Sequence, residues 1–211
     1  VRADVAGATA AHHRLRVSLS KLDEAAVRAP SRLPDWTVGH VLTHLARNAD
    51  SHVRVLEGAI RGEHREQYAG GVEQRRADIE AGAGRPVAAL VEDVTHSADQ
   101  LEAVWMVATP AAWTGHGLTS GTVWPARDLP FHRWREVEVH HVDMGVGYEI
   151  SDWPDNYVTA ELPRALAALP DRLSDHQARR RLLAWLLGRA ERPGDLVIEP
   201  WQSRRQHYYR R

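Results

Sequence analysis

The chain has 211 residues, of which 43% are hydrophobic and 26% charged, and its 27 basic residues nearly balance 28 acidic ones. This composition is typical of a globular protein, and the net charge of -1 gives no electrostatic reason to expect nucleic acid or an anionic membrane as a partner. The lack of cysteine excludes disulfides, thiolate metal ligands and a cysteine nucleophile, whereas 13 histidines leave imidazole chemistry available.

The N-terminal third of the chain predicts two long helices. Apolar residues stand at near-helical spacing through residues 5–29, which predicts a first helix that Pro30 ends. Thr37 is a plausible N-cap of the second helix, because apolar side chains follow at 3–4 spacing through residues 38–60. Residues 31–36 form the loop between them.

The middle of the chain predicts two further helices and a long connection. A third helix opens near Pro86 and carries an apolar stripe as far as Trp105. Residues 108–127 are rich in Gly, Thr and Pro, and we expect a long loop or irregular hairpin there. A fourth helix begins at residues 128–130 and ends near Asp143. Four such helices predict a mainly α fold, a four-helix bundle over residues 1–150.

The pattern changes after Gly147. Residues 151–156 are typical of a linker, and a further segment and a helix are expected at residues 158–169 and 175–189. The apolar run at residues 196–198 predicts a strand. We therefore expect a small C-terminal α/β domain over residues 151–211.

Two residues of the fourth helix could hold a metal ion. Glu136 and His140 are four residues apart, so both side chains lie on one face of the helix. Two protein ligands on one helix, a third from another helix and one open position make a catalytic zinc site. Spacing alone leaves the third ligand open between His40, His44 and His52, and an exposed ion pair is the alternative explanation of the pattern.

Two segments resemble the metal motifs of a known family. Residues 36–49, WTVGHVLTHLARNA, resemble the first metal motif of the mycothiol-dependent maleylpyruvate isomerase family, which belongs to the DinB-like four-helix bundles. Residues 135–145, REVEVHHVDMG, are similar to the second. The resemblance implies a divalent metal, expected to be zinc, with His44, Glu136 and His140 as its ligands.

The same resemblance implies two functional arginines. Residues 73–78, EQRRAD, fall where the family has an arginine implicated in catalysis, which points to Arg75. Residues 183–189, LAWLLGR, resemble the C-terminal segment whose Gly-Arg pair carries a second one, here Arg189, which we expect to act in catalysis and cofactor binding. A solvated surface arginine is the alternative at both positions.

The activity implied by the resemblance is a zinc- and mycothiol-dependent isomerisation. A metal-bound mycothiol thiolate would add to the activated double bond of maleylpyruvate, the carbon–carbon bond would rotate, and the thiolate would leave to give fumarylpyruvate. Asp143 and His40 could orient the metal ligands. One alternative is a mycothiol S-transferase that acts on electrophiles or in a natural-product pathway. Another is a non-catalytic bundle whose metal shell is closed by His52 or His132.

The expected partners are small molecules: mycothiol and an electrophile or unsaturated keto acid. No apolar run is long enough to span a membrane, and the first residues lack the apolar stretch of a secretory signal, so we expect a cytoplasmic protein. We expect it to be a monomer or a homodimer. The basic tail at residues 204–211 interleaves aromatic side chains but is short, and we expect no nucleic-acid binding.

Overall fold

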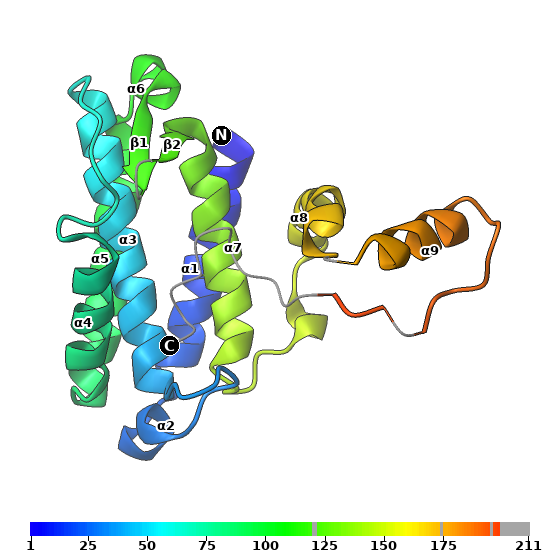
Figure 1. Ribbon diagram of the computed structural model, residues 1–211. Coiled ribbons are helices and arrows are strands. Elements are labelled where there is room, and N and C mark those ends of the chain that lie inside the picture. The colour runs from blue at the N-terminus through cyan, green and yellow to red at the C-terminus, as the bar shows by residue number, and fades with distance from the viewer. Residues whose placement is uncertain (120–121, 174, 195, 199–211) are drawn as a thin grey trace. The chain divides into compact units, whose positions relative to one another are not determined.

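Four long helices run alongside one another in the first part of the chain (Figure 1). They are α1 (Arg2–Leu19), α3 (Val38–Ile60), α5 (Val87–Val107) and α7 (Leu129–Asp143). Helix α3 packs against α5 and α7, and α1 packs against α7 and α5. Their apolar stripes meet in one core, which includes Ala8, Leu15, Val41, Leu42, Leu45, Leu56, Leu90, Leu101, Trp134 and Val137. The predicted four-helix bundle is confirmed.

The computed structural model describes residues 1–119, 122–173, 175–194 and 196–198. The chain divides into two compact units, the first from Val1 to Trp153 and the second from Pro154 onwards. None of the described helices is long and apolar enough to cross a membrane. The basic tail at residues 204–211 lies outside the described residues.

The prediction of one continuous helix over residues 5–29 is wrong. Helix α1 ends at Leu19, and a separate short helix, α2, spans Glu24–Arg28. The carboxylate of Asp23 accepts a hydrogen bond from the backbone N–H of Ala26 at 2.7 Å and so starts α2 as its N-cap. Apolar spacing continues across the break, which is why periodicity alone did not reveal it.

Helix α4 (Gly71–Ala83) was not predicted. Most of its side chains are exposed, and Ile79 is its one large buried apolar residue, so it carries almost no periodic signal. It packs against α3 through a close backbone approach at Gly39 and Gly82. A Cβ added at Gly39 would collide with the backbone oxygen of Ala83.

The region at residues 108–127 contains a hairpin, one of the two structures expected there. Strand β1 (His116–Thr119) pairs antiparallel with β2 (Thr122–Pro125), and Gly117 lies opposite Trp124. A short helix, α6 (Pro110–Thr114), precedes them, and a 3-10 turn at Ala126–Asp128 leads into α7. The backbone N–H of Leu118 donates to the carbonyl of Arg65 at 2.9 Å, which ties the α3–α4 connection to the hairpin.

A 3-10 turn at Ile150–Asp152 lies near the end of the first unit. The described part of the second unit contains α8 (Asp155–Ala168), a 3-10 turn at Leu169–Arg172 and α9 (His176–Leu186). Residues 196–198 have no regular structure, so the predicted strand is wrong. A strand needs a neighbouring strand for its backbone hydrogen bonds, and no described residue pairs with this run.

Candidate metal centre

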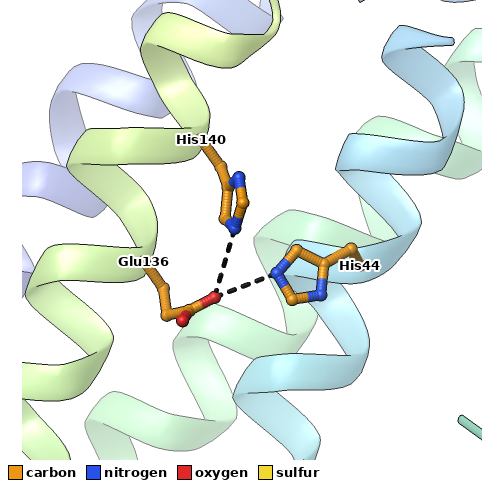
Figure 2. Close-up of side chains that lie close together, drawn as sticks. All are labelled: His44, Glu136 and His140. Carbon is orange, nitrogen blue, oxygen red and sulfur yellow. Dashed lines mark hydrogen bonds and ion pairs between the residues drawn. The ribbon is translucent and has the colours of Figure 1, made fainter. Parts of the chain in front are cut away.

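Three side chains from two helices converge in the bundle (Figure 2). His44 comes from α3, whereas Glu136 and His140 come from α7. Oε2 of Glu136 lies 2.9 Å from Nε2 of His44 and 3.4 Å from Nε2 of His140. One ligand atom from each residue can be chosen so that all three lie within 4.8 Å of one another. The three residues that the family motifs indicated are therefore brought together.

Local structure explains why these side chains meet. Helix α3 starts at Thr37, which forms a capping box with His40: the Thr37 N–H donates to His40 Nδ1 at 3.1 Å, and Thr37 Oγ1 accepts from the His40 N–H at 3.4 Å. His44 follows one turn later on the buried side of the helix. On α7 the four-residue spacing places Glu136 and His140 one above the other.

The centre is closed around the histidines and more open at the carboxylate. Side chains of His44 and His140 are 2% and 3% exposed, and that of Glu136 is 13% exposed. Burial lowers the pKa of His44 to about 3. Burial also opposes the charged form of His140, but hydrogen bonds to Asp143 and Glu136 raise its pKa to about 9. Without metal, His140 is therefore protonated and Glu136 is ionised. Hydrogen bonds from His140 and His44 hold the pKa of Glu136 well below its usual value, although burial acts in the opposite direction.

The donor set fits a divalent metal. Nε2 of His140 is buried and its one near polar neighbour among the described residues is Oε2 of Glu136 at 3.4 Å, while Nδ1 of the same ring lies 2.8 Å from Oδ2 of Asp143. A carboxylate behind a histidine in this way orients its ring for metal binding. Two ligand atoms of a tetrahedral zinc ion are about 3.3 Å apart, close to the separations from Glu136 to both histidines. Two imidazole nitrogens and one carboxylate oxygen are the ligands of many catalytic zinc sites.

Arg75 lies directly behind His44. Its Nη2 is 2.9 Å from Nδ1 of His44, and its guanidinium also stands over the ring of Tyr68 at 5.4 Å. Arg75 is thus half-buried at the centre rather than solvated on the surface. The sequence placed it by resemblance only, since nothing predicted the helix α4 that carries it.

The other candidate residues have different places. The ring nitrogens of His40 contact Thr37 and Glu80 rather than one of the three candidate ligands, whereas Asp143 contacts His140. Neither His52 nor His132 joins the three-residue cluster found among the described residues. Arg189 is exposed in the second unit, directly after Gly188, which has a positive φ of 65° at the end of α9.

Sequence reasoning missed the buried arginine next to the centre. Arg133 is fully buried on α7, three residues before Glu136, and bonds Asn48 of α3 and His12 of α1. An arginine in a helix is ordinarily exposed, so the residue type did not predict that Arg133 is buried. The one available signal was its spacing of three from Glu136, which places it on the same side of the helix.

Comparisons with known proteins agree on one family. The model of the mycothiol maleylpyruvate isomerase N-terminal domain matches residues 8–145. A crystal structure of the mycothiol-dependent maleylpyruvate isomerase is similar at a TM-score of 0.71 and 30% identity, over 78% of this chain and 67% of that one. The crystal structure of a histidine-to-alanine mutant of that isomerase gives the same TM-score and coverage at 29% identity. No curated protein sequence matches significantly.

Proposed function

Because the chain belongs to the mycothiol maleylpyruvate isomerase N-terminal domain family, we propose that it is a zinc- and mycothiol-dependent cis–trans isomerase that converts maleylpyruvate to fumarylpyruvate. The observation that carries the proposal is the convergence of His44, Glu136 and His140 on one point between α3 and α7. Three protein ligands leave a fourth position for a thiol, as a catalytic zinc site requires.

His44, Glu136 and His140 would hold the metal, and Asp143 would keep the ring of His140 in its binding orientation. When bound, the metal would lower the pKa of a coordinated thiol so that the thiolate is present at neutral pH. A thiolate is a nucleophile that can add to an activated double bond and later leave it. The chain has no cysteine, so this thiol must come from a small molecule.

The arginines would handle the negative charge of the substrate. Addition of a thiolate to the double bond of an unsaturated ketone moves charge onto the carbonyl oxygen, and a fixed cation stabilises that charge by several kcal/mol. Arg75 lies within hydrogen-bond distance of the ligand His44 and is the nearest such cation on α4. We assign Arg189 a second contact, to a carboxylate of the substrate or of mycothiol, which a guanidinium binds with two hydrogen bonds.

Metal content and thiol binding test the proposal together. We expect about one zinc per chain in the wild type and almost none in His44→Ala, measured by plasma mass spectrometry. Mycothiol titrated into the zinc-loaded wild type should bind, and maleylpyruvate should then isomerise without thiol consumption. Absence of zinc after incubation with the metal would contradict the proposal. Consumption of one thiol per turnover would instead indicate an S-transferase.

A further inference from the structure

A second pair of polar side chains joins α3 and α7 next to the metal ligands. Asn48 follows His44 by one turn of α3, and Arg133 precedes Glu136 by nearly one turn of α7. Nη1 of Arg133 donates to Oδ1 of Asn48 and to the carbonyl of Leu45, both at 2.8 Å. The two helices are thus linked twice in succession, first through the metal ligands and then through Asn48 and Arg133.

Two polar atoms at this second link lack a partner. Nη2 of Arg133 and Nδ1 of His52 are both buried and make no hydrogen bond in the described part of the chain. Arg133 is 0% and His52 1% exposed. His52 stands one turn beyond Asn48 on α3, and the Arg133 charge adds to the burial that lowers the pKa of His52 to about 3. A buried polar atom without a partner is costly, so such atoms mark places where a water or ligand completes the structure.

Arg133 has no contacting anion among the described residues, although the more distant carboxylates of Glu136, Asp50 and Glu102 favour its charge. No described carboxylate forms an ion pair with it, and its remaining hydrogen bond goes to the neutral ring of His12 at 2.9 Å. Burial lowers the pKa of Arg133 to about 10, which leaves it charged at neutral pH. A buried cation is stabilised further when an anion contacts it and accepts its hydrogen bonds. A bound carboxylate would satisfy both its charge and its free N–H.

We propose that Arg133, Asn48 and His52 form a carboxylate-binding subsite, one helical turn from the metal ligands, which receives the carboxylate at the double-bond end of the substrate. The inference rests on the proposed function for the identity of that substrate. Nη2 of Arg133 donates to one carboxylate oxygen, and His52 in its Nδ1–H form donates as well. The subsite holds the double bond beside the metal ligands and selects dianionic substrates.

The decisive variant is His52→Phe. Phenylalanine is also a flat ring, one ring atom larger, and it removes a polar atom that is unsatisfied in the structure. The gain from removing that atom should offset part of the cost of the larger ring, so the variant should fold. Maleate, a cis dicarboxylate that resembles the double-bond end of the substrate, serves as the probe in isothermal titration calorimetry with the zinc-loaded full chain. We expect His52→Phe to weaken maleate binding about tenfold or more, as loss of a hydrogen bond to a charged group does.

Glu138→Gln is the matched control. Glu138 is a buried carboxylate of the same helix, but it accepts hydrogen bonds from Arg14, Trp134 and Tyr148, away from the subsite. This variant should lose stability and keep maleate affinity. Arg133→Met should weaken maleate binding more than His52→Phe; if it fails to fold, His52→Phe decides.

The outcomes separate the subsite from the function. Unchanged maleate affinity in His52→Phe, or no maleate binding by the wild type, overturns the subsite and means that a buried water serves these atoms. If the wild type is an active isomerase and His52→Phe binds maleate as tightly as the wild type, the proposed function stands and the proposed subsite is wrong. Maleate binding that depends on His52, in a protein without isomerase activity, keeps the subsite and rejects the function.

Discussion

His44 and His140 share one carboxylate partner but differ in what lies at their other ring nitrogen. Asp143 can accept a hydrogen bond from the Nδ1–H of His140, which is the arrangement found at many metal-bound histidines. At His44 the neighbour of Nδ1 is the guanidinium of Arg75, which can only donate. A neutral histidine that binds metal through Nε2 carries its proton on Nδ1. The Nδ1–H of His44 and the guanidinium N–H of Arg75 would then be two donors that face each other. Metal loading should therefore release Arg75 from His44.

This conflict predicts that Arg75 opposes metal binding. Removal of its charge and its hydrogen bond in Arg75→Met should tighten zinc binding by about tenfold, the effect of one hydrogen bond to a charged group, while isomerase activity falls. Competition with a chromogenic zinc chelator measures the affinity. Arg76→Met removes an equal charge from the next position of α4 and should leave zinc affinity unchanged. Weaker zinc binding in Arg75→Met would contradict the prediction.

At the scale of elements, the packing of α4 against α3 determines the position of Arg75. The two helices meet where Gly39 faces the backbone oxygen of Ala83 and Gly82 faces the side chain of Thr43. Only glycine allows the backbones to approach this closely. Since α3 carries His44 and α4 carries Arg75, the contact between these two residues depends on that approach.

We expect Gly39→Ala to push the two helices apart. The added methyl group meets a backbone carbonyl that cannot rotate away, so the free energy of unfolding should fall by about 1–3 kcal/mol, as in overpacked cores. Urea denaturation followed by circular dichroism measures this loss. The control is Gly84→Ala, where an added Cβ has nothing within 4 Å and φ is -84°. Equal stability of the two variants would show that the approach is not tight.

Elements were predictable where apolar side chains repeat over a long stretch. This holds for α3 and α5. Helix α7 was predicted from its start and stop signals, and α4, whose side chains are mostly exposed, left no such pattern. At the centre, helical spacing predicted that Glu136 and His140 share a face. It could not choose between His40, His44 and His52, because all three lie on or beside the buried face of α3. The burial of Arg133 depends on partners 85 and 121 residues away, which no local pattern reveals.

At the scale of the whole bundle, four buried histidines make folding of the metal-free protein sensitive to acid. Burial lowers the pKa of His12 and of His141 to about 4 and that of His44 and of His52 to about 3. Nε2 of His12 accepts a hydrogen bond from Arg133 and so cannot be protonated without losing it. The unfolded chain takes up protons at these histidines near pH 6.5 and the folded chain does not. The raised pKa of His140 acts in the opposite sense, but it is one group against four.

The metal-free protein should therefore lose stability as the pH falls from about 6.5 towards 4. The shift of His12 alone corresponds to about 2 kcal/mol at pH 5. Urea unfolding at pH 7.5 and pH 5 measures the loss, which should shrink by about this amount in His12→Gln. The adjacent His13 is exposed, and His13→Gln should behave as the wild type does. A stability that stays constant between these pH values would contradict the prediction.

A metal between α3 and α7 would also act as a removable cross-link. Its ligands His44 and Glu136 are 92 residues apart in the chain, so the bound ion closes a long loop in any state that retains both ligands. Because the complete ligand set exists only in the folded bundle, metal binding draws the equilibrium towards that state. Proteases cleave the opened chain in proportion to its population. The lifetime of this protein among proteases would then follow the supply of metal as well as the strength of its core.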